Sequence, residues 1–280
     1  MATVNQAEEN ASTILGGQGF AVERLERADG DPGKRADFRV TYGAETYVLE
    51  VTSKEETQDF HRFAAELRTK GIATMTAPPC YNNSIDGILR RKHDQIVQTP
   101  TAAEAFGIIW IELLHDDGHF IAEVIEHTVY GLAELFACEE GHCFPFRDFR
   151  CYYYDHYSFY RMPRANGVMV LTKKGCRLFV NAKAENYSVF KGSRLYRLLK
   201  PGMIDPEREA EEKRCMLLGP EVDRQGQHAK WEYLKRTYGY LTTRKLEGRF
   251  SGAIMIDADS LPPAIINNRD CQQHSEGQQE

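Results

Sequence analysis

The sequence has no long hydrophobic run and no large excess of charge of one sign. No stretch approaches the roughly 18–20 consecutive apolar residues that a membrane helix needs. The N-terminal residues MATVNQAEEN have neither the basic start nor the apolar core of a secretory signal. We therefore expect a cytoplasmic protein with no membrane partner. The formal net charge of −6 argues against a protein that coats nucleic acid through bulk positive charge.

Cysteine is present but shows no disulfide framework. The seven cysteines are odd in number and scattered, which predicts reduced thiols and no structural disulfide. One segment, CEEGHC, offers zinc ligands in Cys138, His142 and Cys143, with Cys151 eight residues later. A structural zinc site needs four such ligands, and this spacing fits no common zinc module. Buried thiols are therefore the favoured interpretation, with zinc as the alternative.

The chain is long enough, and at 42% hydrophobic residues apolar enough, to bury a substantial core. Apolar periodicity and turn residues predict alternating helices and strands, and therefore an α/β fold. In the first half we expect helices over 5–16, 55–70, 84–98 (with Ser84 as its cap) and 126–136, a loop over 76–83, and strands over 20–26, 37–42, 46–52, 107–114 and 119–125.

The second half gives fewer clear signals. Lys173-Lys174-Gly175 between two apolar runs predicts a hairpin of strands 168–172 and 177–181. Helices are expected over 205–214 and 227–238, and a last strand over 252–257. We divide the chain into a core over 1–126, a C-terminal elaboration that selects substrate over 127–266, and a disordered polar tail over 267–280.

The stretch TYVLEVTSK, residues 46–54, carries polar side chains at alternate positions of a strand. Glu50, Thr52 and Lys54 share one face if the strand persists that far. Asp37 begins the preceding strand, so pairing of the hairpin places it opposite roughly residues 51–53 and within reach of Glu50. Two adjacent carboxylates repel each other unless a cation lies between them, and hard oxygen ligands suit magnesium or manganese.

Each residue also has a simpler interpretation. Glu8 is compatible with a favourable acid in the first turn of a helix. Asp37 is compatible with a turn cap, and Glu50 with a cross-strand pair to Lys54 or Arg39. The position of Glu50 after Tyr47-Val48-Leu49 favours a site, because that apolar run predicts burial, which an isolated carboxylate resists.

The order of these residues resembles the PD-(D/E)xK nuclease superfamily, which has the restriction-endonuclease-like fold. In that family a helix with an acid leads into a hairpin with an aspartate on one strand and E-x-K on the next, followed by another helix. The matching residues here are Glu8, Ala11, Leu15, Gly19 and Phe20, then Arg35-Ala36-Asp37-Phe38, then Leu49 to Lys54, and later Lys92-x-x-Gln95. The resemblance spans about the first 114 residues.

The resemblance implies an α/β fold with a mixed central sheet flanked by helices and an elaborated α+β C-terminal half. It implies a metal-dependent nuclease in which Asp37, Glu50 and the Val51 carbonyl hold Mg²⁺ or Mn²⁺, and Glu8 orients a second ion or a water. Thr52 stands where the family has its lysine, so Lys54 is expected to assist the nucleophile. A degenerate module that binds nucleic acid or protein without cleaving is the alternative.

The expected substrate is DNA, with RNA as an alternative, and the resemblance allows a homodimer. By analogy only, proteins of this kind serve restriction, phage-defence or mobile-element systems. Two segments, 183–200 and 230–249, interleave cations with aromatic rings, as nucleic-acid surfaces do, although a helical face with cations extended over core aromatics is the favoured interpretation. The residues expected to contact nucleic acid are Lys92, Gln95, Lys191, Arg194, Arg197, Lys235 and Arg236.

Overall fold

The computed structural model describes residues 2–25, 35–55, 58–70, 72–77, 80–100, 105–115, 118–139, 147–245 and 251–256. These residues form an α/β protein with a mixed seven-stranded sheet, so the predicted class is confirmed. The chain divides into two compact units, each described by itself below. The first unit contains Met1–Glu55 and Pro79–Arg249, and the second contains Glu56–Pro78 and Phe250–Glu280.

The central sheet of the first unit takes strands from both sides of residue 126. In spatial order they are β1 (Ala21–Arg24), β2 (Phe38–Tyr42), β3 (Glu45–Ser53), β5 (Phe106–Leu113), β8 (Ala165–Thr172), β9 (Gly175–Val180) and β10 (Met203–Ile204). The pairs β1–β2, β2–β3 and β8–β9 are antiparallel, whereas β3–β5, β5–β8 and β9–β10 are parallel. The predicted hairpins β2–β3 and β8–β9 are both confirmed.

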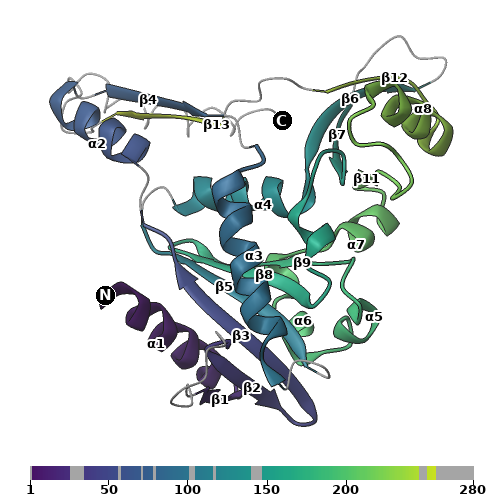
Figure 1. Ribbon diagram of the computed structural model, residues 1–280. Helices are drawn as coiled ribbons and strands as arrows, with labels where there is room; N and C mark the ends of the chain where they lie inside the picture. The colour runs from purple at the N-terminus through teal and green to yellow at the C-terminus, as the bar shows by residue number, and fades with distance from the viewer. Residues whose placement is uncertain are drawn as a thin grey trace, which may run out of the picture. The chain divides into compact units, whose positions relative to one another are not determined.

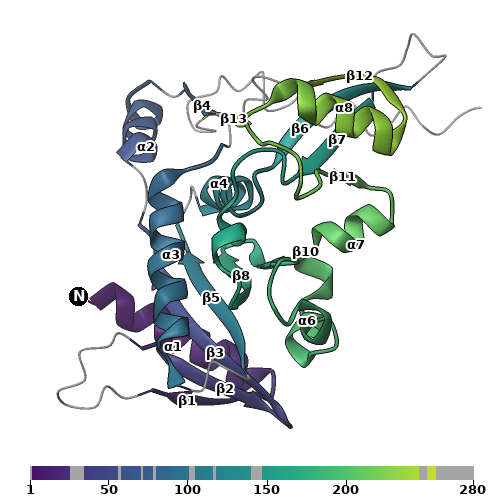
Figure 2. The same cartoon turned by 45° about the vertical axis from the view of Figure 1, so that its right-hand side comes forward.

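Helices cover both faces of this sheet. One face packs against α3 (Asn83–Val97) and α4 (Gly118–Tyr130), and the other against α1 (Ala2–Gly17), α5 (Tyr187–Phe190) and α6 (Arg194–Leu198). Alternation along β3 assigns its side chains: Val48 belongs to the α3 cluster, whereas Leu49 and Val51 belong to the α1 cluster. Figure 1 shows α3 in front of the central strands, and Figure 2 shows it beside β5.

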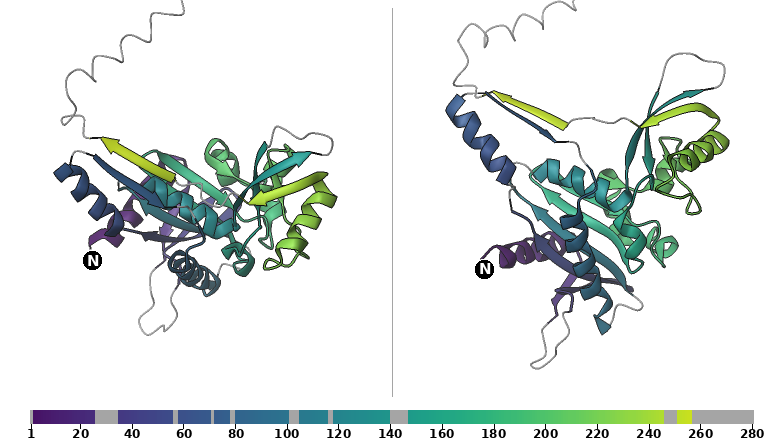
Figure 3. Two further views of the ribbon diagram at one scale, coloured as in Figure 1. Left: turned by 90° about the horizontal axis from the view of Figure 1, so that it is seen from above. Right: turned by 45° about the horizontal axis from the view of Figure 1, so that its top comes forward.

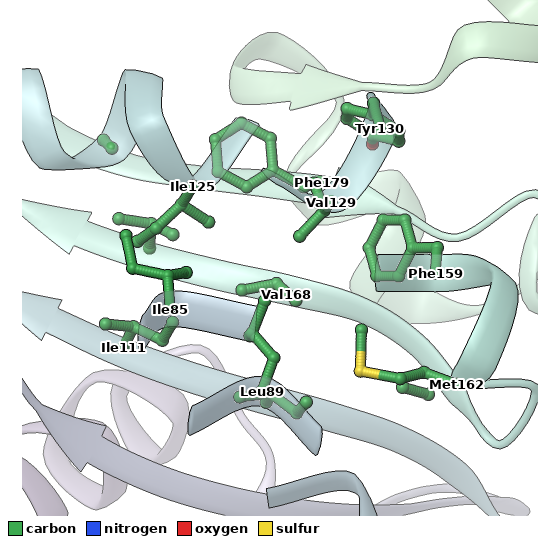
Figure 4. Packing of buried hydrophobic residues seen from close by; sticks show 14 of the residues in the cluster. Ile85, Leu89, Ile111, Ile125, Val129, Tyr130, Phe159, Met162, Val168 and Phe179 are labelled. Carbon is green, nitrogen blue, oxygen red and sulfur yellow. The ribbon is translucent and has the colours of Figure 1, made fainter. Parts of the chain in front are cut away.

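Helix α3 follows from its sequence. Asn82 caps it by accepting hydrogen bonds from the N–H groups of Ser84 and Ile85, each at 3.0 Å. The predicted cap, Ser84, lies inside the first turn instead. Ile85 and Leu89 recur at helical spacing, and Figure 4 shows both of them facing the strand residues Ile111 and Val168.

The prediction of a strand over 119–125 is wrong, because these residues lie in α4. The run HFIAEVI is rich in β-branched and aromatic residues, but its buried positions Ile121, Val124 and Ile125 continue to Val129 with helical spacing. Gly118 starts the helix so close to β5 that a Cβ there would lie 2.2 Å from the Leu113 carbonyl oxygen. The helix predicted over 126–136 therefore ends early, at Tyr130.

A smaller four-stranded sheet completes the first unit. Its order is β11 (Cys215–Leu217), β7 (Arg147–Tyr152), β6 (Ala133–Glu139) and β12 (Tyr240–Lys245). Helix α8 (Gln227–Tyr238) matches its predicted range and packs Leu234 into the core of this part. The remaining elements are η2 (Ser158–Arg161), η3 (Lys200–Gly202) and α7 (Pro206–Glu211), the last of which is shorter than the helix predicted over 205–214.

The second unit joins two distant parts of the chain. Helix α2 (Gln58–Lys70) and β4 (Ile72–Ala77) lie between β3 and α3 in sequence, and β13 (Ser251–Ile256) comes from the C-terminal region. Strands β4 and β13 pair antiparallel, side by side in both views of Figure 3. The last predicted strand, 252–257, is thus confirmed, whereas β4 extends into the predicted loop over 76–83. The predicted tail over 267–280 lies outside the described residues.

Candidate functional site

The candidate site lies where β2 and β3 stop pairing. The last paired residues are Phe38 and Leu49, and the N–H of Asp37 still donates to the Leu49 carbonyl at 3.1 Å. Continuing this register places Asp37 opposite Glu50, one to three residues earlier on β3 than predicted. Beyond this point the N–H of Val51 has no strand partner on that side and donates instead to Asp37 Oδ2 at 2.8 Å. The end of the ladder thus fixes the aspartate carboxylate.

Glu50 is the buried acid of the site. Its side chain has no exposed surface and points to the α3 face of the sheet, in line with Val48. The pKa of Glu50 is raised to about 8: burial raises it most, the charge of Asp37 also raises it, and the ammonium of Lys92 acts in the opposite direction. One oxygen, Oε2, is buried and receives no hydrogen bond from the described residues.

The cation beside Glu50 is Lys92 of α3. Its Nζ donates to Glu50 Oε1 at 2.6 Å and to the Val51 carbonyl oxygen at 3.3 Å. The Lys92 side chain is 21% exposed, so the ammonium lies between the buried carboxylate and solvent. The sequence predicted a nucleic-acid contact for Lys92 and gave the role of amine to Lys54. The sequence did contain a signal for this contact, because Lys92 lies on an amphipathic helix that follows the strand carrying Glu50.

Lys54 follows the last residue of β3. Its backbone N–H donates to the Glu112 carbonyl at 3.2 Å, and its own carbonyl oxygen lies 2.7 Å from His115 Nε2. The structure therefore brings Lys92, and not Lys54, into hydrogen-bond contact with Glu50. Thr52, in the family's lysine position, directs its hydroxyl to the Ser53 carbonyl at 3.4 Å.

The end of α3 and the residues just after it hold the segment that leads into Asp37. Thr99 Oγ1 accepts from the Ala36 N–H at 2.9 Å and itself donates to the Gln95 carbonyl at 2.9 Å. The Gln95 amide reaches the Arg35 carbonyl at 3.5 Å, which is a long hydrogen bond. Gln95, predicted to contact nucleic acid, thus also lies against the strand entry. Thr99 was not identified from the sequence, because its partner is 63 residues away.

Two further buried acids, Glu8 and Glu112, lie on the α1 side of the central sheet. Glu8 is buried on α1 and forms an ion pair with Arg24 of β1. Residues Ala7 and Ala11 of the same helix pack against the face that carries Val51, opposite the face of Glu50. On this side Asn10 Nδ2 also donates to the buried Glu112 at Oε2, at 3.0 Å, a contact that sequence reasoning did not find.

The other predicted nucleic-acid contacts lie away from Glu50. Arg194 stacks over the Tyr42 ring, with its guanidinium carbon 5.3 Å from the centroid, and Arg197 lies 4.0 Å from Glu45, so both are at the turn of the β2–β3 hairpin. Lys191 lies over the Tyr187 ring. Lys235 and Arg236 are exposed on α8. Of the seven predicted residues, Lys92 contacts Glu50 and Gln95 contacts the segment that leads into Asp37, whereas Arg194 and Arg197 contact the other end of the hairpin.

The donor set fits a hard divalent cation. Asp37, Glu50 and the Val51 carbonyl supply oxygen ligands, and the buried Glu50 Oε2 has an unused acceptor position. Magnesium commonly binds through one or two carboxylates and fills its remaining positions with water or substrate phosphate. Among the described residues no three His, Cys, Asp or Glu side chains gather into a metal-binding group. Any ion here would therefore keep several non-protein ligands.

The zinc alternative cannot be placed on the structure as a set. His142 and Cys143 lie outside the described residues, and so does the side chain of Cys138. Cys151 is buried on β7, and burial raises the pKa of its thiol strongly.

Within the described part of the chain, no helix has the length and apolarity to cross a bilayer.

No protein-family model, curated protein or solved structure matches the chain. The functional argument therefore depends on the geometry of the residues themselves.

Proposed function

We propose that this protein is a metal-dependent nuclease of the restriction-endonuclease-like fold that hydrolyses phosphodiester bonds in DNA. The observation that carries the proposal is the pairing of a fully buried carboxylate, Glu50, with the ammonium of Lys92 at 2.6 Å, beside a second carboxylate, Asp37. A buried acid with a strongly perturbed pKa and a specific charged partner is a feature of functional sites.

The order of the elements supports the fold part of the proposal. A helix, an antiparallel hairpin and a second helix are what the resemblance implies, and α1, β2–β3 and α3 occur in that order. The insertion of α2 and β4 separates β3 from α3 without changing the order of the others. Strand β5 then pairs parallel to β3, so the acid-bearing strand is internal to the sheet.

Each residue has a role that its contacts allow. Asp37, Glu50 and the Val51 carbonyl would hold Mg²⁺ or Mn²⁺, which would supply positive charge at the scissile phosphate and increase the acidity of a bound water. Lys92 places its ammonium beside these ligands, where it can orient a water or stabilise negative charge on the phosphate. Gln95 and Thr99 hold the strand entry. The predicted role of Glu8 in orienting a second ion or a water stays a prediction.

One observation favours the alternative, a degenerate module that binds nucleic acid or protein. Lys92 already places a positive charge on the Glu50 carboxylate, and the family's lysine position holds Thr52. In that case the pair of charges would be a remnant that stabilises the sheet. The surfaces around Lys191 and Lys235 would then carry the binding function.

The test is cleavage of supercoiled plasmid and of single-stranded DNA with Mg²⁺ or Mn²⁺. The intact protein is compared with Asp37→Asn, Glu50→Gln, Lys92→Met and Lys54→Met. Arg91→Met is the matched control, because it removes the same charge from an exposed position next to Lys92. The first three variants should lose cleavage by about 100-fold or more, since positioned acid–base and electrostatic groups contribute on that order.

Lys54→Met and Arg91→Met should retain most of the activity. Metal-dependent cleavage that survives Asp37→Asn or Glu50→Gln would contradict the proposed site. No cleavage by the intact protein, together with salt-sensitive DNA binding, would favour the degenerate module.

A further inference from the structure

The ammonium of Lys92 contacts two of the three groups that are expected to bind a metal ion. Its Nζ lies 2.6 Å from Glu50 Oε1 and 3.3 Å from the Val51 carbonyl oxygen. We propose that Lys92 is an internal counter-ion that holds this ligand set in place in the metal-free protein, and that a divalent cation binds by displacing the ammonium from these oxygens. The inference rests on the metal site of the proposed function.

Once Glu50 is ionised, the metal-free site needs a counter-ion because of where this side chain lies. Its side chain is fully buried on a strand that is internal to the sheet, next to Val48 and opposite Ile109 of β5. A buried charge whose partner is removed is strongly destabilising. Asp37 adds a second negative charge beside it. Lys92 offsets one of these charges, so the pair of carboxylates still attracts a further positive charge.

The nearest other charged group on β2 is already engaged. Arg39, two residues beyond Asp37, donates to Glu23 of β1 at 3.0 Å. The cation that is in contact with Glu50 is therefore the one from α3. A divalent ion would balance two carboxylates, whereas the single charge of an ammonium does not. The unused buried oxygen Glu50 Oε2 gives such an ion a ligand that Lys92 does not occupy.

Lys92 can leave its position without movement of the helix. Helix α3 is held by its Asn82 cap and by Leu89 and Ile96, which are buried in the core. The Lys92 side chain, in contrast, is partly exposed and has a flexible four-carbon stem. Rotation of this stem would release both oxygens and turn the ammonium toward solvent or a bound phosphate. One lysine would then serve the metal-free site as counter-ion and the loaded site as amine.

The experiment measures thermal unfolding of the full chain at pH 9, where Glu50 is ionised, first in EDTA and then with added Mg²⁺. The variants are Lys92→Met, Glu50→Gln/Lys92→Met and, as the matched control, Arg91→Met. In EDTA, Lys92→Met should melt about 6 °C or more below the intact protein, the shift that loss of a buried partner implies for a chain of this size. Mg²⁺ should raise the melting temperature of Lys92→Met more than that of the intact protein.

The double variant keeps the test decisive if Lys92→Met folds poorly. Because glutamine carries no charge, Glu50→Gln/Lys92→Met should regain stability in EDTA and lose its response to Mg²⁺. A Lys92→Met protein that folds only with Mg²⁺ is the limiting form of the expected result. Arg91→Met should behave like the intact protein throughout.

Two results would overturn the inference. The first is a Lys92→Met protein as stable in EDTA as Arg91→Met. The second is a destabilised Lys92→Met protein whose stability is restored by Glu50→Gln but not by Mg²⁺. That result would show an ion pair between Lys92 and Glu50 in which the ammonium is not replaced by a divalent cation. Neither result depends on cleavage, so a protein that shows the expected Mg²⁺ response and yet cuts no DNA would disprove the nuclease while keeping the counter-ion.

Discussion

The carboxylate of Asp37 accepts a hydrogen bond from the backbone N–H of Val51 at 2.8 Å, across the gap where two strands separate. The carbonyl group of the same residue, Val51, accepts from Lys92 Nζ at 3.3 Å. The backbone of Val51 thus positions the Asp37 carboxylate through its N–H group and the Lys92 ammonium through its carbonyl group. Ligand placement here follows from the end of the β2–β3 ladder rather than from a loop.

The first prediction concerns pH and Glu50. In metal-free protein the folded state keeps a proton on Glu50 up to about pH 8, whereas the unfolded chain releases it near the ordinary pKa of 4.5. Since the unfolded state binds fewer protons in this window, the free energy of unfolding should fall as pH rises from about 4.5 to about 8. Urea unfolding in EDTA at pH 5, 6, 7 and 8.5 measures this.

Glu50→Gln is the control for this titration, because it cannot release the proton. Its stability should decline less than that of the intact protein over the same window. Parallel curves for the two proteins would show that Glu50 titrates normally. In the presence of Mg²⁺ the decline should also be smaller, since an ion bound to the ionised carboxylate opposes the proton.

The second prediction moves the lysine to the family's position. Thr52 lies two residues after Glu50 on β3, so Thr52→Lys in the Lys92→Met background returns an amine to the strand that carries the acid. We expect Thr52→Lys/Lys92→Met to cleave plasmid at least about tenfold faster than Lys92→Met, a part of the contribution usual for such groups. Thr52→Lys alone serves as the control for crowding.

Equal cleavage by Lys92→Met and by the double variant, with both proteins folded by circular dichroism, would count against the role of the amine. It would leave Lys92 as a structural partner of Glu50.

The third prediction concerns stability away from the site. Asp205 is fully buried and accepts from the hydroxyl groups of Tyr187 at 2.9 Å and Tyr196 at 2.7 Å, while it also caps α7. Asp205→Ala removes the cap and leaves two hydroxyl groups without their acceptor, so it should cost about 3 kcal/mol or more of unfolding free energy. Urea unfolding gives the value.

Asp223→Ala is the matched control, because Asp223 is exposed and accepts one backbone hydrogen bond from Gln225 at 2.9 Å. It should cost less than about 1 kcal/mol, as exposed polar substitutions do. Comparable losses for Asp205→Ala and Asp223→Ala would contradict the assignment of Asp205 as a buried acceptor for several donors.

The acid pair was predictable because its determinants are local. A short hairpin brings Asp37 and Glu50 together, and alternation along the strand places Glu50 inward. The register differed from the expected one because β3 begins at Glu45, which shortens the predicted turn. The cation was not predictable in the same way, because Lys92 lies on a helix 42 residues after Glu50 in sequence. Only the tertiary packing determines whether Lys54 or Lys92 contacts the Glu50 carboxylate.

In the fold as well, elements set by local sequence were predictable and elements set by distant contacts were not. Helices with clear apolar spacing, such as α3 and α8, were found within one residue. Helix α4 was mistaken for a strand over 119–125, because its β-branched and aromatic residues favour strands when they are considered in isolation. Strand β4 was missed because its only described partner, β13, comes from the far end of the sequence.

That pairing also sets an order of events during synthesis. Strand β4 leaves the ribosome about 180 residues before β13, which at roughly 5–20 residues per second is about 10–40 s. The unit that contains Asp37, Glu50 and Lys92 uses no residue beyond Arg249, so all of its chain is synthesised before β13. Until then the backbone edge of β4 has no β13 to bind, and it is open to pairing with a neighbouring nascent chain.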